Sequence, residues 1–69
     1  MMNSRIVIGN KIKNIRQKKG LTQKQLSELS GMTQTTISKI EVGKFNASID
    51  LISKLIEPLG AELDIKEVD

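Results

Sequence analysis

Cysteine and histidine are absent from the sequence, and its 69 residues include only one aromatic side chain, a phenylalanine. The lack of cysteine and histidine excludes disulfides, the usual zinc sites, thiol nucleophiles and imidazole general bases. We therefore expect no enzymatic activity, no metal and no cofactor. Because single-stranded nucleic acids are usually bound by several stacked aromatic rings, one phenylalanine also disfavours that ligand.

Long apolar runs are also missing. No run approaches the roughly 18 residues of a membrane-spanning helix. The apolar cluster of residues 6–8 lies before the first lysines, unlike the order in a signal peptide. We therefore expect a cytoplasmic protein without membrane contacts. A chain of this length forms one domain near the size at which a single core becomes marginal, so self-association would add stability.

Charge is distributed unevenly along the chain. Residues 1–47 contain nine Lys/Arg and two acids, a net charge of +7, whereas residues 48–69 contain two lysines and six acids, a net charge of −4. A basic front half suits a polyanion, and an acidic rear half suits self-association or another protein. Lysines that only maintain solubility explain the same composition about equally well.

Four glycines mark the ends of helix-like segments, because a left-handed C-cap favours glycine. The first helix is expected over about residues 5–19, with Ser4 as its N-cap. Its apolar face carries Ile8, Ile12 and Ile15 at helical spacing. The glycines are Gly20, Gly31, Gly43 and Gly60.

Two short helices follow around a turn at residues 30–32. Thr22 and Gln25 have the spacing of a capping box, which predicts the start of the second helix. Leu26 and Leu29 are expected on its buried face. Thr33 is expected to cap the third helix, which buries two isoleucines, Ile37 and Ile40, and turns four polar side chains outward: Gln34, Thr35, Ser38 and Lys39.

The fourth helix is expected to begin after Ser48, a good N-cap. Pro58 should kink or end its last turn, because proline lacks the backbone N–H donor. Beyond Gly60 the apolar residues alternate with polar ones over residues 61–66, which predicts a short strand. The apolar positions of the helix are Leu51, Ile52, Leu55, Ile56 and Leu59.

A lone strand needs a partner for its backbone hydrogen bonds. The partner could be the stretch of residues 6–8, the same strand of another copy, or a different protein. Pairing between two copies is favoured, because two-fold dimers are the commonest assembly. Residues 1–60 would then form the helical domain and residues 61–69 a dimerisation element.

With these segments in place, the sequence resembles the Cro/phage-repressor (Xre) family of helix-turn-helix proteins over about residues 8–60. The resemblance implies an all-α, four-helix, lambda-repressor-like domain that binds double-stranded DNA. The similarity is carried by matching residues throughout this range: Ile8-Gly9, Ile12 to Arg16, Gly20-Leu21-Thr22-Gln23, Leu26, Gly31, Ile37-Ser38, Glu41, Gly43-Lys44 and Leu59-Gly60.

The resemblance also assigns roles to particular residues. Gln34, Thr35, Ser38 and Lys39 would reach base edges in the major groove, where their side chains have suitable chemistry. Without the resemblance, these four would be an ordinary solvated helix face. Contacts with the DNA backbone are implied for six residues: Gln23, Thr33, Thr36, Lys44, Asn46 and Arg16. Gln23 could instead be a plain polar residue of a first turn, and Lys44 could compensate the dipole of the third helix.

Arg16 and Glu41 occupy positions that form a partly buried ion pair in some relatives. Arg16 could also touch a phosphate. Contacts between two copies are expected at Leu63, Ile65, Phe45 and Leu59, although Phe45 could instead be a satellite of the core.

The leading functional hypothesis is a dimeric repressor that occupies a palindromic operator in the cytoplasm, associated with the nucleoid. From the short length we expect either a Cro-like protein or the DNA-binding antitoxin of a toxin–antitoxin pair. In the second case, the acidic end would neutralise a toxin protein, and DNA binding would serve autoregulation. An enzyme is disfavoured, because the carboxylates of Glu62, Asp64 and Glu67 fit a solvated edge better than an active site.

Overall fold

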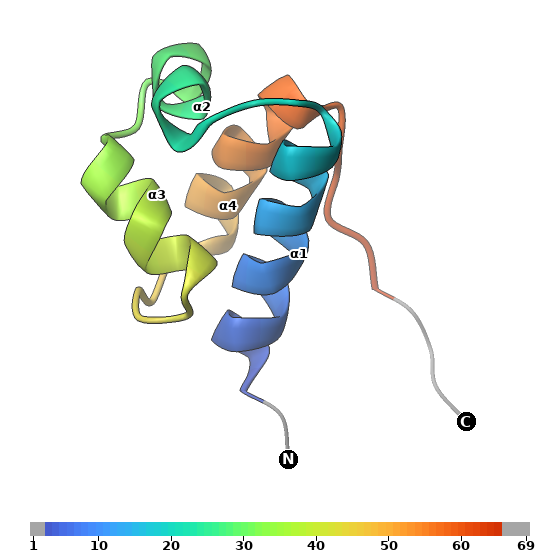
Figure 1. The fold of residues 1–69 in the computed structure, drawn as a ribbon. Coiled ribbons are helices and arrows are strands. Elements are labelled where there is room, and N and C mark those ends of the chain that lie inside the picture. Colours follow the sequence, from blue (N-terminus) through green and yellow to red (C-terminus); the bar gives the residue numbers. More distant parts are fainter. Residues whose placement is uncertain (1–2, 66–69) are drawn as a thin grey trace.

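The computed structural model describes residues 3–65, which fold into four α-helices followed by a single 3₁₀ turn (Figure 1). Helix α1 packs against α3, while α2 packs against α3, α4 and η1. The expected all-helical architecture is confirmed. None of the helices in this part of the chain has the length and hydropathy needed to cross a membrane. The elements are α1 (Ser4–Lys18), α2 (Gln23–Ser30), α3 (Gln34–Glu41), α4 (Ile49–Ile56) and η1 (Glu57–Leu59).

Side-chain caps start the three short helices, as expected. The capping box of α2 is complete: Thr22 Oγ1 accepts from the backbone N–H of Gln25 at 3.0 Å, and Gln25 Oε1 accepts from that of Thr22 at 2.8 Å. Thr33 and Ser48 cap α3 and α4 by accepting from the N–H three residues on. These caps fix where each helix begins.

Helix α1 starts one residue earlier than expected. Its N-cap is Asn3, whose Oδ1 accepts from the backbone N–H of Arg5 at 2.9 Å, and Ser4 is the first helical residue. The predicted N-cap, Ser4, was therefore wrong by one residue. Asparagine and serine are about equally good N-caps, so the sequence did not distinguish the two positions. Along the same helix, Ile12 is buried and Ile15 half-buried, whereas Ile8 lies at the surface.

Hydrogen-bonded glycine turns end the helices. After α3, the N–H of Gly43 donates to the carbonyl of Ile40 and the N–H of Lys44 to that of Lys39, while Gly43 has a φ of 78°. This is a Schellman motif, and its left-handed residue favours glycine. Helix α4 ends at Ile56, and the chain continues as the 3₁₀ turn that contains Pro58. This agrees with the expectation that Pro58 ends the last turn of the helix.

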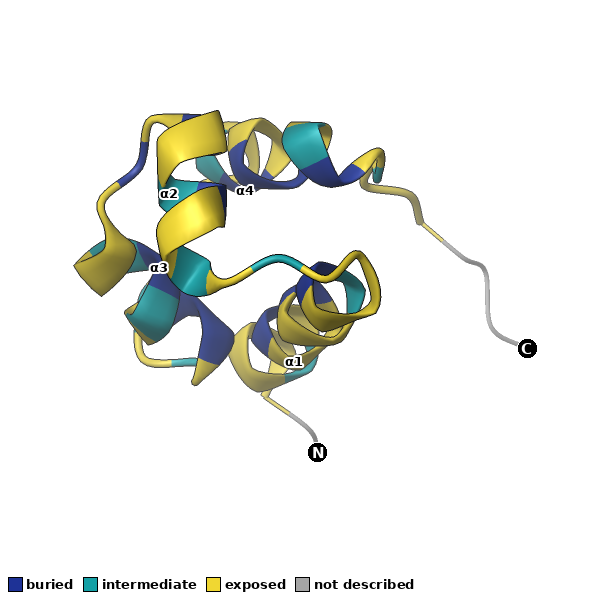
Figure 2. Cartoon of the chain, turned by 45° about the horizontal axis from the view of Figure 1, so that its top comes forward, coloured by how far each residue is buried: buried dark blue, intermediate teal, exposed yellow. Residues whose placement is uncertain are grey.

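Nine apolar side chains from all five elements and the α2–α3 turn form one core. The helices have buried positions on their inner sides and exposed positions on their outer sides (Figure 2). Leu29 is not part of this core: it is 59% exposed, whereas Leu26 is completely buried. The prediction that both leucines face inward was wrong, because α2 meets its neighbours along a narrow stripe centred on Leu26. The core consists of Ile12, Leu26, Met32, Ile37, Ile40, Ile52, Leu55, Ile56 and Leu59.

The residues after Gly60 run back along α1 without regular secondary structure as far as residue 65 (Figure 1). The expected strand is therefore not formed within the described chain. Residues 6–8, one possible ladder partner, belong to α1, where their backbone groups bond within the helix. Leu59 is 2% exposed and belongs to the core of its own chain, so it offers little surface to a second copy. Lys66, Glu67 and the end of the expected dimerisation element lie outside the described residues.

Helix α1 approaches the end of α3 closely at Gly9. It is buried within α1, and a Cβ atom at this position would lie 2.1 Å from the carbonyl oxygen of Ile40 and 3.0 Å from that of Glu41. Both obstacles are backbone atoms near the end of α3, so only glycine allows this approach. The contact fixes the position of α3 relative to the rest of the domain.

Candidate nucleic-acid interface

The four polar residues on the outer face of α3 share a shallow depression with Gln23 from the start of α2. The depression has a volume of about 400 Å³ and is lined by these five residues alone: Gln23, Gln34, Thr35, Ser38 and Lys39. Ser38 is half-buried, while the other three side chains of α3 are exposed. Amide, hydroxyl and ammonium groups together offer both hydrogen-bond donors and acceptors, which suits recognition of base edges.

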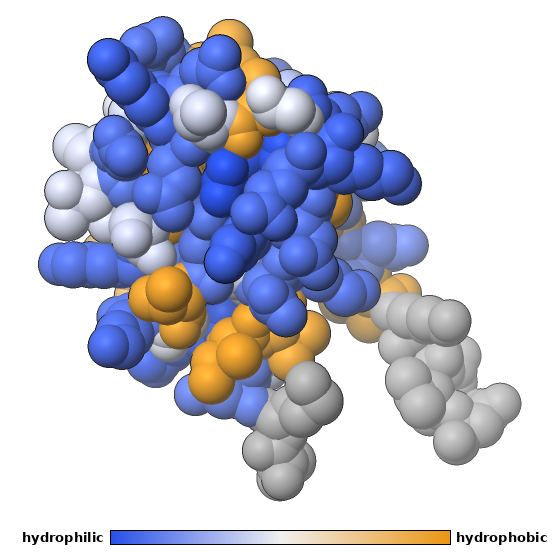
Figure 3. All heavy atoms as spheres, viewed as in Figure 1, coloured by the Kyte–Doolittle hydropathy of each residue, from blue (hydrophilic) through white to orange (hydrophobic). Residues whose placement is uncertain are grey.

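Helix α3 presents this face because its opposite side is anchored in the core. Ile37 is completely buried and Ile40 is 3% exposed. One turn of helix separates these positions, so both anchors lie on one stripe and the polar residues on the other. Most of the surface in the view of Figure 3 is hydrophilic, and apolar atoms appear mainly along its lower edge.

A buried ion pair ties the end of α3 to α1. Arg16 Nε donates to Glu41 Oε2 at 2.7 Å, and Arg16 Nη2 donates to Glu41 Oε1 at 3.0 Å. Arg16 Nη1 also donates to the carbonyl oxygen of Leu21 at 2.7 Å, in the loop that leads to α2. The bidentate geometry is the strongest form of this pair. One guanidinium therefore connects α1, α3 and the start of the helix-turn-helix.

The environment of the pair keeps Arg16 charged. The hydrogen bonds that Arg16 donates to Glu41 raise the pKa of Arg16, and this effect outweighs burial, which alone would lower that pKa. No buried side-chain nitrogen or oxygen atom of the described residues lacks a hydrogen-bond partner. Arg16 is 7% exposed, so it offers little surface for a contact with a phosphate.

Gln23 joins the same network. Its Nε2 donates to Glu41 Oε1 at 3.0 Å, which holds the side chain at the rim of the depression on α3. One amide N–H is used in this bond, and the second N–H and the carbonyl oxygen are left for a ligand. Sequence reasoning missed this bond, because no local pattern connects residues 18 positions apart.

The two threonines at the start of α3 bond to each other. Thr33 Oγ1 accepts from the backbone N–H of Thr36 at 3.2 Å and donates to Thr36 Oγ1 at 2.9 Å. Thr33 is exposed and Thr36 half-buried. Both hydroxyl groups are therefore already hydrogen-bonded within the protein. A phosphate that contacts either of them would have to share or replace this hydrogen bond.

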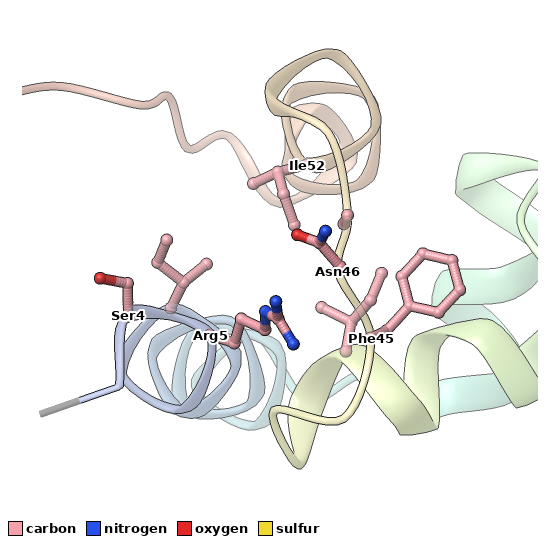
Figure 4. A pocket seen from close by; sticks show the side chains of 8 residues that line it. Ser4, Arg5, Phe45, Asn46 and Ile52 are labelled. Carbon is pink, nitrogen blue, oxygen red and sulfur yellow. The ribbon is translucent and has the colours of Figure 1, made fainter.

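Lys44 and Asn46 lie in the loop between α3 and α4, and both are exposed. Asn46 faces Arg5 across a hollow of about 260 Å³ between this loop and α1, with Ile52 at its back (Figure 4). Phe45 is half-buried and packs against the core. Its position fits a satellite of the core, the alternative to a contact between copies.

Comparison with known proteins places this geometry in a family. The sequence model described as Helix-turn-helix matches residues 12–66. The chain belongs to the Cro/C1-type helix-turn-helix family. Within this family, α2 and α3 form the helix-turn-helix and α3 corresponds to its second helix.

Several bacterial regulators are similar to the chain. An uncharacterized HTH-type transcriptional regulator of Haemophilus influenzae is 40% identical to it over 63 residues. The aligned region covers 91% of this chain and 64% of the relative. The HTH-type transcriptional regulator PuuR of Escherichia coli is 40% identical over 55 residues, covering 80% of this chain but 30% of the relative. The control protein C.BamHI of Bacillus amyloliquefaciens is 36% identical over 61 residues, covering 87% and 75%. The chain thus spans less than two thirds of the first two relatives.

Proposed function

We propose that this protein is a sequence-specific, double-stranded DNA-binding transcriptional regulator. The observation that carries the proposal is the shared depression on α2 and α3, where four polar side chains of α3 stand beside an anchored glutamine. In a helix-turn-helix, the second helix enters the major groove and the first braces it against the backbone. The names of the relatives, which are transcriptional regulators and a control protein, agree with this function.

Gln34, Thr35, Ser38 and Lys39 would read base edges. A glutamine pairs well with adenine N6 and N7, and a lysine donates to guanine O6 and N7. The methyl group of a threonine contacts the thymine methyl. Each good pair discriminates against the wrong base by about 1–3 kcal/mol.

A second set of residues would contact the DNA backbone and set the register of α3. Gln23 is held at the N-terminus of α2, where backbone N–H groups also favour a phosphate. Lys44 and Asn46 would contact the backbone from the loop after α3, and Thr33 and Thr36 from its start. Lys44 supplies the only charge of residues 44–47, so the salt dependence should be modest for a protein of this kind.

We further propose that two copies occupy a palindromic operator and repress transcription, in the cytoplasm and close to the nucleoid. The two α3 helices would then be about 34–36 Å apart, one turn of DNA. A role as an antitoxin would require a toxin partner, and none of the three relatives described above carries such a name.

Selection of binding sites from random duplexes tests the function directly. A palindromic site should be enriched, and the logarithm of affinity should fall with the logarithm of salt by about 0.9 per neutralised phosphate. Gln34→Ala should relax specificity at one or two positions of each half-site, whereas Lys44→Ala should weaken all duplexes alike. Lys54→Ala, on the exposed side of α4, is the matched control and should change neither property. If no duplex is enriched over background, the proposed function is wrong.

A further inference from the structure

Arg5 lies in the first turn of α1 and is exposed. Among residues 3–65, its guanidinium forms neither an ion pair nor a hydrogen bond. The nearest acidic residue along the sequence is Glu28. A cation is unfavourable at this end of a helix, because the backbone N–H groups there already carry partial positive charge. A residue that breaks a local rule in this way often has a function.

Arg5 lies on the side of α1 that packs against α3. The buried residues of the helix are Gly9, Ile12 and Arg16, and their spacing places them on one side together with Arg5. Gly9 meets the backbone of the last turn of α3. Arg5 comes one turn before Gly9 and therefore lies beside the loop that follows α3, where it lines the same hollow as Asn46.

The loop after α3 packs directly against the first turns of α1. A Cβ atom on Gly43 would lie 2.9 Å from the Cα atom of Ile6 and 3.0 Å from its backbone nitrogen. The two backbones approach so closely that no side chain fits between them. Because Ile6 directly follows Arg5, this contact fixes the position of the loop relative to Arg5.

Polar side chains from α1 and the loop converge on the hollow between them (Figure 4). Ser4 and Arg5 line it from α1 and Asn46 from the loop, and its volume is about 260 Å³. The described residues that line it include no acid, since the others are apolar. Guanidinium, amide and hydroxyl groups all offer hydrogen-bond donors. Donors with a positive charge and no carboxylate nearby suit an oxyanion such as a phosphate.

Residues 44–47 contribute one positive charge to the proposed contact with the DNA backbone, that of Lys44. Arg5 supplies a second cation at the same place, across the hollow from Asn46. We propose that Arg5 and Asn46 together bind a phosphate of the DNA backbone. The inference rests on the proposed function, since it adds a contact from α1 to the same complex. A phosphate contact carries no sequence information, so Arg5 should contribute to the binding of every duplex alike.

Binding of an enriched duplex by the wild type and Arg5→Ala at two salt concentrations tests this contact. The loss of one phosphate contact lowers the slope of log affinity against log salt by about 0.9. The variant should therefore bind about tenfold more weakly at about 50 mM salt, and about threefold more weakly at about 200 mM salt. Lys18→Ala removes the same charge from the last turn of α1 and should keep the slope of the wild type.

The melting temperature separates a contact with DNA from a structural role of Arg5. Because a cation in the first turn opposes the helix dipole, Arg5→Ala should melt at the temperature of the wild type or above it. Circular dichroism would measure this on the protein without DNA. A variant that melts at a lower temperature and binds more weakly with an unchanged salt slope would show that Arg5 supports the fold, and the proposal would be wrong.

Asn46→Ala tests whether the two side chains share one phosphate. Arg5→Ala and Asn46→Ala combined should weaken binding by less than the product of the two separate losses, because both contacts are made to the same group. Losses that multiply would contradict a shared phosphate.

A single half-site separates a phosphate contact from an effect on assembly. Arg5→Ala should weaken binding to the half-site as well as to the full palindrome. A loss confined to the palindrome would mean that Arg5 acts between two copies, which contradicts the proposal. If the wild type binds an enriched duplex and Arg5→Ala matches its affinity and slope, this inference is wrong while the proposed function holds. If the wild type binds no duplex, both are wrong.

Discussion

Replacing Gly9 with alanine would have two opposite effects on the free energy of unfolding. The structure indicates which of them is larger. Glycine in a helix interior is normally unfavourable, so alanine at this position would gain about 0.8–1 kcal/mol from helix propensity. The added methyl group, however, would lie 2.1 Å from the carbonyl oxygen of Ile40. A carbon and an oxygen without a bond between them prefer a separation of more than 3 Å. Helices α1 and α3 would therefore have to move apart.

The steric cost exceeds the gain in helix propensity. Overpacking by one methyl group typically costs about 1–3 kcal/mol. The upper part of this range applies to Gly9, because the three nearest atoms all belong to the backbone of α3 and cannot rotate away. After the gain in propensity is subtracted, Gly9→Ala should destabilise the domain by at least about 1 kcal/mol. For a domain of this size, that loss lowers the melting temperature by about 4–8 °C.

Thermal and urea unfolding followed by circular dichroism would measure the effect. Asn14 offers the matched control, since it is an exposed residue of the same helix. At that position alanine should be more stable than glycine by about 1 kcal/mol, the opposite order from position 9. A Gly9→Ala variant that is as stable as the wild type, or more stable, would show that α1 and α3 are not in close contact.

Two further predictions concern buried side chains. Arg16→Met should cost about 3–5 kcal/mol in urea unfolding, because the buried charge of Glu41 would lose its positive partner and keep only the hydrogen bond from Gln23. The surface change Lys18→Met should cost little, and equal losses would contradict the burial of the pair. The ion pair raises the pKa of Arg16. Its contribution to the free energy of unfolding should therefore be present throughout the neutral pH range, and be lost only as the pH rises through that raised pKa. Leu26→Ala should cost about 2–5 kcal/mol and Leu29→Ala less than about 0.5 kcal/mol in thermal melts, whereas similar costs would mean that both leucines are buried.

Local signals in the sequence predicted the helices well. Thr22, Thr33 and Ser48 cap the helices that they were expected to cap, and Gly43 ends α3. Each of these interactions joins groups within five positions along the chain, so its chemistry is visible in a short window. The error at Asn3 has the same origin, because two adjacent residues were equally suitable caps.

Contacts between distant residues were harder to predict. The periodicity of α2 marks Leu26 and Leu29 equally, and only the positions of α3, α4 and η1 leave Leu29 uncovered. The bond from Gln23 to Glu41 and the approach of Gly9 to α3 likewise depend on how helices cross. A glycine inside a helical pattern was the only local hint of that approach.

The sequence by itself determined the class of the fold, the starts of the three short helices, and which polar residues α3 turns outward, because short-range capping and periodicity specify these properties. The tertiary structure alone decided that those residues share one depression with Gln23, and that Gln23 donates a hydrogen bond to Glu41. It also showed that residues 61–65 form no strand within the described chain. An alternating pattern specifies which side chains share a face, whereas a strand forms only where another backbone supplies its hydrogen bonds.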